Sequence, residues 1–452
     1  MVTNGKLAGS RALWLLQNRA GIGLLALTAS LLLGSTAAMA TPFDDCAAEV
    51  ASPYEKGFES VGKDAKEVDV DAAITACKAA LKADSNSTQV RAWLGRAYYL
   101  DSNDKEGVPL LERAADDGNA LAQWLYGDML ITGDAIDADM SKGNEYLQKS
   151  ADQGFAPGQN SLALSYDYGQ GLEQDYTQAQ KYYRMAAVQG LPLAQSNIGL
   201  MYEDGLGVDQ DYIAAGAWFQ RAADQGDASG QVNLGKLYQD GLGVEVDNDK
   251  AAKYYKLASD QGDKYGENNL GFLMDNGLGV EEDAKGAAEL YQKAADQKLP
   301  LAEHNLALLY EDGRGVKQDY DKAIELYTAA ADGGEMRAAV NLGLLYLNGT
   351  GTDVDYEAGM KYTKMAADAG QPIGQNNMGH IYENGLGVPV DRDEALHWYQ
   401  LSSDQGYDLG VENYNRLQAE IAGKASTPTD DAKSAPAETD VVKSKNKDKI
   451  SN

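Results

Sequence analysis

Residues 191–226 read LPLAQSNIGLMYEDGLGVDQDYIAAGAWFQRAADQG, and this stretch decides the fold. Ala194, Ile198 and Tyr202 recur at four-residue spacing, which places them on one apolar face of a helix. The glycines of the following GLGV supply the positive φ that a chain reversal needs. Asp211 then stands as the N-cap of a second helix, whose alanines allow close packing. The stretch therefore predicts two antiparallel helices joined by a tight loop.

The same pattern returns every 36 residues along most of the chain. An Asp keeps the N-cap position of the second helix in every copy. A glycine in the middle of the first helix recurs in most copies, which suggests that two helices approach closely there, because glycine is otherwise a poor helix former. Residues 119–406 therefore hold eight repeats without insertion or deletion. The glycine that closes the second helix, replaced once by Lys298, stands at Gly118, Gly154, Gly190, Gly226, Gly262, Gly334, Gly370 and Gly406.

These repeats predict an all-α fold, an α-solenoid of antiparallel helix pairs. A single pair cannot bury its apolar stripes, whereas stacked pairs bury a continuous core. The ends of such a stack should be capped by atypical units. Residues 41–118 contain a degenerate helical pair, and residues 407–422 read as a lone closing helix. Residues 423–452 are almost free of apolar side chains, and we expect them to be disordered.

The register A-x-x-x-L-G-x-x-Y-x-x-G-x-G-V-x-x-D-x-x-x-A-x-x-Y-Y-x-x-A-A-x-x-G resembles the Sel-one-like repeat, a relative of the tetratricopeptide repeat. Residues 302–334, AEHNLALLYEDGRGVKQDYDKAIELYTAAADGG, match it almost completely, and the resemblance covers residues 119–406. It implies a right-handed superhelix that acts as an adaptor for protein complexes. Residues 41–118 resemble a tetratricopeptide-type unit that would form the N-terminal cap.

The first 40 residues predict a secretory signal peptide. They hold no Asp or Glu, and a basic leader precedes an apolar run from Ile22 to Leu33. Small residues ending in Ala-Met-Ala place the cleavage site between Ala40 and Thr41. The alternative is an uncleaved membrane anchor, for which the apolar run is short. The leader looks bacterial, and we expect a periplasmic or secreted protein of a Gram-negative cell.

Only two cysteines are present, Cys46 and Cys77, and an oxidising compartment predicts one disulfide between them. Two unpaired thiols are the alternative. The mature chain would be strongly acidic, because 69 Asp and Glu face 39 Lys and Arg, three of them in the leader. This charge disfavours binding to nucleic acid, since phosphate contacts require clustered Lys and Arg.

The sequence offers little catalytic chemistry. It has three histidines, His304, His380 and His397, and none stands at metal-ligand spacing. No G-x-S-x-G, phosphate-binding or zinc motif is present, and the Gly-x-Gly pairs are the turns of the repeat itself. We therefore expect no catalytic residues, no cofactor and no metal.

Two rows of residues on the first helix are candidates for partner binding. One is an asparagine ladder, for which hydrogen bonding between repeats is the structural alternative. The other is the variable position after the mid-helix glycine, which reads Leu, Leu, Lys, Phe, Leu, Leu and His in successive repeats and could instead pack against the second helix. The candidates are Asn197, Asn233, Asn269, Asn305, Asn341 and Asn377, with Lys236, Phe272, Leu308 and His380.

The sequence thus favours an exported scaffold that holds a protein or peptide on the concave surface of a solenoid, and its acidic charge favours a basic partner. A hydrolase acting on cell-wall or β-lactam substrates is an alternative without support from particular residues. A carbohydrate-binding protein is a third reading, based on the 27 tyrosines. Many of these tyrosines recur with core periodicity, which favours packing.

Overall fold

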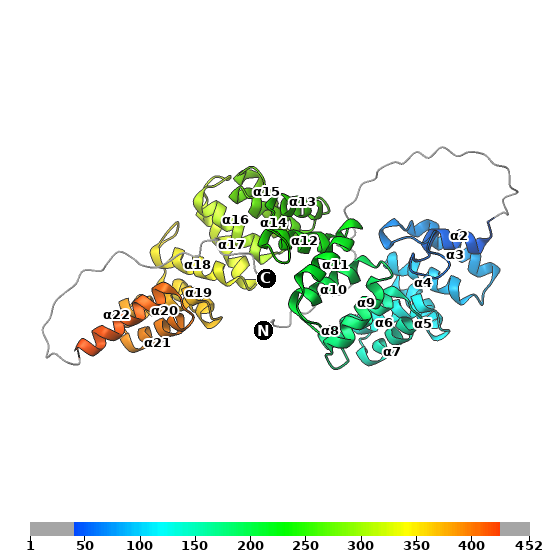
Figure 1. The fold of residues 1–452 in the computed structure, drawn as a ribbon, viewed down its shortest axis with the longest axis horizontal. Coiled ribbons are helices and arrows are strands. Elements are labelled where there is room, and N and C mark those ends of the chain that lie inside the picture. The colour runs from blue at the N-terminus through cyan, green and yellow to red at the C-terminus, as the bar shows by residue number, and fades with distance from the viewer. Residues whose placement is uncertain (1–39, 425–452) are drawn as a thin grey trace. The chain divides into compact units, whose positions relative to one another are not determined.

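The computed structural model describes residues 40–424. Within this range the chain forms twenty-one α-helices and one short 3-10 helix, with no strand (Figure 1). Within each of its two compact units, consecutive helices pack against one another, as an α-solenoid requires. The structure divides into two compact units, here called the first unit, up to Asp263, and the second unit, from Lys264.

The helices of the first unit, with the 3-10 helix η1 after α2, have the following bounds: α2 (Pro42–Val50), η1 (Ala65–Glu67), α3 (Val70–Ala83), α4 (Thr88–Leu100), α5 (Asp104–Asp116), α6 (Ala120–Thr132), α7 (Met140–Asp152), α8 (Ala156–Tyr168), α9 (Tyr176–Ala187), α10 (Pro192–Asp204), α11 (Tyr212–Asp224), α12 (Ala228–Asp240) and α13 (Asn248–Ser259).

The helices of the second unit are α14 (Lys264–Asn276), α15 (Ala284–Asp296), α16 (Pro300–Asp312), α17 (Tyr320–Asp332), α18 (Met336–Asn348), α19 (Tyr356–Asp368), α20 (Pro372–Asn384), α21 (Arg392–Asp404) and α22 (Asp408–Lys424). From α6 to α21, each even-numbered helix is helix A of a repeat and the next helix is its helix B.

The predicted caps and turns are present in every repeat. Each helix B begins after an Asp whose side chain accepts backbone N–H bonds from the first turn, an arrangement that contributes about 1 kcal/mol per cap. Helix A ends at a glycine in the left-handed conformation, for example Gly205 at φ 70° and Gly241 at φ 69°. The capping residues are Asp139, Asp175, Asp211, Asp247, Asp283, Asp319, Asp355 and Asp391.

The mid-helix glycine marks the contact between the two helices of one repeat, as the sequence suggested. A Cβ added at Gly235 would lie 2.7 Å from Cε1 of Tyr255, on helix B of the same repeat. At Gly379 it would lie 2.5 Å from Cδ1 of Tyr399. Because real Cβ atoms essentially never approach so closely, the glycine lets the aromatic ring lie directly on helix A.

The N-terminal cap is larger than the sequence suggested, because it contains two helix pairs, α2 with α3 and α4 with α5. Cys46 of α2 and Cys77 of α3 form the expected disulfide. A buried ionic network also holds this region together. Arg96 donates to the carbonyls of Val50, at 2.7 Å, and Lys63, at 2.9 Å, while Glu55 accepts from the indole N–H of Trp93.

Burial in the cap shifts the pKa of both charged groups. Desolvation raises the pKa of Glu55, although hydrogen bonds from Ser52, Trp93 and Gln89 oppose the shift. Desolvation lowers the pKa of Arg96 to about 10. Pairing with carbonyls and a nearby carboxylate explains how a buried arginine is retained here.

At the C-terminal end, α22 continues two residues beyond the predicted boundary, through Gly423, because glycine lowers helix propensity without forbidding a helix. The expected signal peptide, residues 1–40, and the expected tail, residues 423–452, otherwise lie outside the described residues. No helix within residues 40–424 is long and apolar enough to cross a membrane.

Candidate partner-binding surface

The candidate residues all lie on helices A. Within the first unit, helices A of consecutive repeats touch each other directly, α6 with α8 and α10 with α12, in addition to their contacts with helices B. In a curved stack, the layer whose members approach more closely lies on the concave side. Helices A therefore form the inner layer. Their side chains that point away from helices B line the concave surface, which a solenoid offers to a partner.

The asparagine ladder is mainly an internal connection between repeats. Nδ2 of Asn197 donates to Oδ1 of Asn160 on the preceding helix A at 3.1 Å, and Asn305 donates in the same way to Asn268 at 3.0 Å. The closing helix repeats the contact, with Asn413 donating to Asn376 at 2.9 Å.

The other members of the ladder are also mostly withdrawn from solvent. Asn269 accepts a bond from its neighbour Asn268 at 3.0 Å, and Asn341 lies 3.4 Å from the hydroxyl of Tyr327. Asn377 is fully buried, and Asn233 is half-buried. Hydrogen bonding between and within repeats therefore accounts for most of this row, and only its partly exposed members remain proposed contacts.

The variable row differs between the two units. In the first unit Leu200 is 38% exposed, and Lys236 is half-buried. In the second unit Phe272 is only 8% exposed and Leu308 is equally buried, so packing accounts for both. His380 is half-buried and lies beside Asn384 of its own helix, 3.2 Å from its amide nitrogen.

A row of carboxylates, which the sequence analysis did not single out, stands at the twelfth position of helix A. In four of the eight repeats a tyrosine of helix B donates its hydroxyl proton to this residue. The bonds join Tyr183 to Asp167 at 3.0 Å, Tyr255 to Gln239 at 2.8 Å, Tyr327 to Glu311 at 2.7 Å and Tyr399 to Glu383 at 2.9 Å. We call Asp167, Glu203, Asp275, Glu311 and Glu383 the carboxylate row.

Four repeats lack this bond, among them the repeat of Glu203. Phe219 occupies the tyrosine position opposite Glu203, and it has no hydroxyl to donate. Glu203 is only 8% exposed, and its Oε2 is buried without a hydrogen-bond partner. Its Oε1 lies 3.5 Å from Nζ of Lys236 on the next helix A. Desolvation raises the pKa of Glu203, and the Lys236 charge only partly offsets this shift.

Cations from neighbouring elements already bind two further carboxylates of the row. Arg416 of α22 contacts both oxygens of Glu383, at 2.8 and 2.7 Å. Burial works against ionisation there, but the bonds from Arg416 and Tyr399 outweigh it and lower the pKa of Glu383. Arg314 contacts Asp275 at 2.7 Å, yet desolvation still raises the pKa of that carboxyl. Two carboxylates of the row are therefore paired with guanidinium groups of the chain itself.

The glutamine of the recurring Asp-Gln-Gly connects helix B to helix A of the same repeat in six of the eight repeats. The sequence analysis did not identify this contact. The glutamine side chain donates to the fourth residue of helix A in the same repeat, another glutamine or once a glutamate. The bonds are Gln153 to Gln123, Gln189 to Gln159, Gln225 to Gln195, Gln261 to Gln231, Gln297 to Glu267 and Gln405 to Gln375, at 2.7–2.9 Å. Its signal was its regular recurrence, like that of the asparagines.

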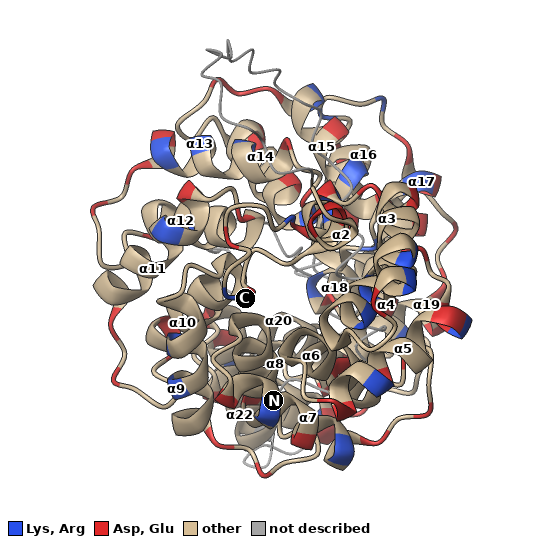
Figure 2. Ribbon diagram, turned by 90° about the vertical axis from the view of Figure 1, so that its right-hand side faces the viewer, with Lys and Arg blue, Asp and Glu red and all other residues tan. Residues whose placement is uncertain are grey.

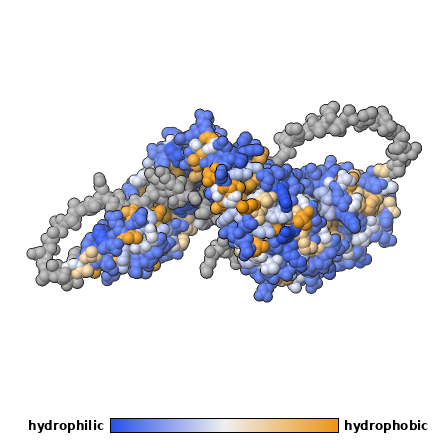
Figure 3. Space-filling view, in the orientation of Figure 1, coloured by the Kyte–Doolittle hydropathy of each residue, from blue (hydrophilic) through white to orange (hydrophobic). Residues whose placement is uncertain are grey.

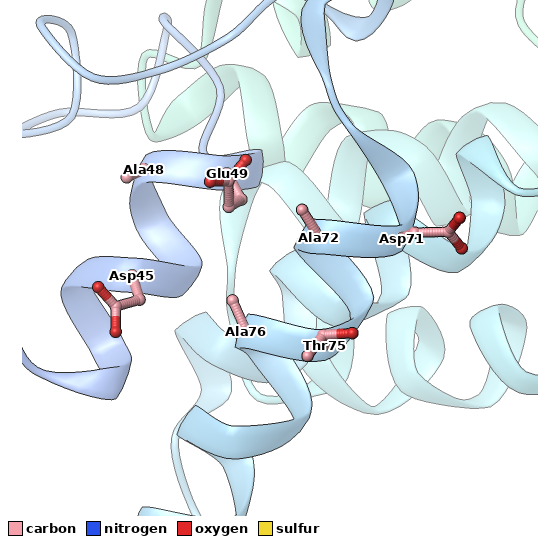
Figure 4. Close-up of a pocket in the computed structure, with 7 residues that line it drawn as sticks. All are labelled: Asp45, Ala48, Glu49, Asp71, Ala72, Thr75 and Ala76. Carbon is pink, nitrogen blue, oxygen red and sulfur yellow. The ribbon is translucent and has the colours of Figure 1, made fainter.

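Other surface features are less specific. A shallow hollow of about 530 Å³ lies between α2 and α3, but the side chains of Asp71 and Thr75 point away from α2 (Figure 4). Within residues 40–424, no three or more His, Cys, Asp or Glu side chains are placed to hold a metal ion. Acidic residues recur along the connections between helices (Figure 2), and the face seen in Figure 3 is mostly hydrophilic with small separate apolar areas.

Comparisons with known proteins agree with this architecture. No protein with a curated description matches the chain in sequence. A Sel1 repeat protein of Oxalobacter formigenes is similar in structure, with 29% identity, a TM-score of 0.50, and coverage of 69% of this chain and 90% of that one. A protective antigen of uropathogenic Escherichia coli with an SLR fold is 25% identical over 82% of this chain and 94% of its own, with a TM-score of 0.49.

The family model for the Sel1 repeat matches eight consecutive segments, in close agreement with the predicted register. The segments are 120–155, 156–191, 192–227, 228–263, 264–299, 300–335, 337–371 and 372–407. Together with the helix pairs, caps and turns described above, these matches show that the chain belongs to the Sel1 repeat family.

Proposed function

We propose that this protein is an exported scaffold that binds a partner protein or peptide along the inner surface of its helices A, without catalysing a reaction. Sel1 repeat folds commonly serve as scaffolds for protein–protein interaction. The observation that carries the proposal is the carboxylate row beside the variable row. In the first unit the carboxylate row contributes the half-buried Asp167 of α8, and the variable row contributes the exposed Leu200 of α10, the next helix A.

Charge selects the class of partner. The whole chain carries a net charge of −30, so a basic protein or peptide would be attracted and other acidic surfaces would be repelled. The inner surface adds local specificity, because tyrosine hydroxyls hold three of its carboxylates in place instead of leaving them to move freely in solvent. The proposed contacts are Lys236, His380 and the accessible edges of the asparagine ladder, with Leu200 and Asp167 added by the structure.

Export is supported by the leader, by the disulfide and by the start of the fold. Disulfides persist in oxidising compartments such as the periplasm. Thr41, the proposed first residue of the mature chain, is the N-cap of α2, and its backbone nitrogen donates to Asp44 at 2.9 Å. Cleavage after Ala40 would give Thr41 a positive α-amino group beside this carboxylate. Mass spectrometry of protein recovered from the periplasm should find Thr41 at the N-terminus.

Affinity capture from an envelope extract tests the binding function. The bait is the purified full chain, and the matched control is the variant Leu200→Lys, which replaces an apolar group on the inner surface with a positive charge that repels a basic partner. We expect one or a few proteins to be retained by the wild type and lost with the variant. Equal recovery with both baits would contradict binding at this surface, and turnover of peptidoglycan or a β-lactam by the purified chain would contradict a purely binding role.

A further inference from the structure

Asp167 is the carboxylate of the row with the most accessible surroundings in the first unit. Its Oδ2 accepts the hydroxyl proton of Tyr183 at 3.0 Å, which fixes the orientation of the carboxyl group. The next residue, Tyr168, is 63% exposed, and it lies close enough to Asp167 to feel its charge. Asp204, at the end of the next helix A, also interacts electrostatically with Asp167. A carboxylate, a second negative charge and an exposed aromatic ring thus meet at one place.

The other end of the chain shows what such a position binds. Glu383 stands at the same register as Asp167 and is held by the hydroxyl of Tyr399, as Asp167 is held by Tyr183. There, Arg416 occupies the ninth position of the following helix and places both terminal nitrogens on the carboxylate. Lys236, at the ninth position of α12, approaches Glu203 in the same manner at 3.5 Å. A cation at this position therefore binds the carboxylate one repeat earlier.

In the repeat that follows Asp167, the ninth position is Leu200. A leucine cannot supply the cation, and within residues 40–424 no Lys or Arg shifts the pKa of Asp167. Its carboxylate interacts instead with Tyr183 and Asp204. The exposed Tyr168 follows it in the chain, and the exposed Leu200 has the register from which Lys236 and Arg416 approach their carboxylates. The position keeps the tyrosine-supported carboxylate of the Glu383 site but lacks its guanidinium.

We propose that Asp167, Asp204 and Tyr168 form a receptor for an arginine side chain of the partner, with Leu200 contacting an adjacent apolar residue. This inference rests on the proposed scaffold function and names the chemistry that the inner surface recognises. A guanidinium can donate two parallel bonds to the Asp167 carboxylate and stack on the ring of Tyr168. An ammonium has no planar face to stack on the ring, although it can lie over it, and it cannot give the carboxylate two parallel bonds.

The geometry also limits the shape of the partner segment. Neighbouring helices pack with their axes roughly 8–10 Å apart, and an extended chain advances about 3.3 Å per residue. An extended segment crossing successive helices A therefore moves about three residues per repeat. We expect an extended basic segment with an arginine within about three residues of an apolar residue, because Asp167 and Leu200 belong to adjacent repeats.

A labelled peptide tests the receptor directly. The probe is a short uncharged peptide carrying one arginine beside a leucine, with lysine and citrulline versions of the same sequence, titrated into the full chain and followed by fluorescence anisotropy. Asp167→Asn keeps an acceptor for Tyr183 but removes the charge. The matched control is Glu173→Gln, an exposed acid in the loop of the same repeat.

We expect the arginine peptide to bind at low salt more tightly than the lysine version, and the citrulline version to bind at least tenfold more weakly. Asp167→Asn should weaken arginine binding roughly tenfold or more, whereas Glu173→Gln should leave it within about twofold. Equal losses in both variants would show a diffuse acidic attraction and would overturn the proposal, as would equal binding of arginine and citrulline peptides.

A second variant fills the receptor from within. Leu200→Arg introduces at α10 the guanidinium that Arg416 provides at α22, so it should occupy Asp167 and abolish peptide binding while the protein keeps its helical circular dichroism and its melting temperature. Undiminished peptide binding by a folded Leu200→Arg variant would refute the site. If the peptides fail to bind but the envelope partner is still lost with the Leu200→Lys bait, the arginine receptor is wrong and the scaffold function stands.

Discussion

Phe219→Tyr should stabilise the protein, because it supplies Glu203 with the bond from helix B that three other carboxylates of the row receive. The wild-type ring of Phe219 occupies the place from which Tyr183 and Tyr255, in the flanking repeats, reach their partners at 3.0 and 2.8 Å. A new hydroxyl would therefore lie within reach of Glu203, whose Oε2 is buried and has no hydrogen-bond partner.

The magnitude follows from the charge of the acceptor. A hydrogen bond to a charged group contributes about 1.5–3 kcal/mol net, and burying the added hydroxyl offsets part of this, so we expect a gain of about 1–2 kcal/mol at neutral pH. The reciprocal change in the preceding repeat, Tyr183→Phe, removes a bond to Asp167 and should lower the free energy of unfolding by a similar amount.

The gain should depend on pH. Burial raises the pKa of Glu203 above its unfolded value, so the folded state holds a proton that the unfolded state has already lost in the pH window between the two values. The wild type therefore loses stability as pH rises through that window. A tyrosine hydroxyl stabilises the ionised carboxylate, so the benefit of Phe219→Tyr should be larger at pH 7 than at pH 4.

Urea unfolding of the full chain at both pH values measures this effect, with far-ultraviolet circular dichroism as the signal and equal slopes as the condition for comparing midpoints. A midpoint at pH 7 that is unchanged or lower in Phe219→Tyr would refute the interpretation of Glu203. A gain of the same size at pH 4 would show that packing of the larger ring, and not the hydrogen bond, is responsible.

Three further changes test the packing of the repeats. Gly235→Ala places a methyl group against the ring of Tyr255 and should cost about 1–3 kcal/mol by urea unfolding; a neutral result would show that the helices have room to separate. Asn305→Leu removes the donor to the buried side-chain oxygen of Asn268 and should also cost about 1–3 kcal/mol. A stabilised variant would contradict the structural role of the ladder. Cys46→Ser opens a loop of 31 residues and should cost about 3 kcal/mol, detected as early proteolysis of the N-terminal cap; unchanged protease resistance would refute it.

The repeat register could be predicted from sequence because local chemistry determines it. Asp211 caps its helix through its own short side chain, and Gly205 takes a left-handed conformation that other residues rarely adopt. These effects act within a few residues, so they are visible as a pattern. The mid-helix glycines could also be interpreted, since Gly235 and its equivalents serve one purpose, close contact with helix B, which for most of these glycines is contact with an aromatic ring.

The carboxylate row escaped sequence analysis because its logic lies in a pair of positions on two helices. Tyr183 and Asp167 are 16 residues apart, and the acceptor varies among Asp, Glu and Gln, so neither position shows a constant residue. The exposure of the variable row could not be predicted either, because it also depends on residues of other helices. The residue at this position changes with the group that faces it, as Lys236 faces Glu203. Variation at this position therefore does not indicate exposure, since Phe272 occupies it and is buried.

Photocrosslinking in living cells tests most directly whether the inner surface of the first unit holds a partner. A photoreactive amino acid replaces Leu200, on the inner row, or Val246, an exposed apolar residue in the connection between α12 and α13 of the same unit. We predict a discrete crosslinked protein from position 200 and none from position 246. No crosslink from position 200, or the same product from both positions, would contradict a scaffold that binds its partner along helices A.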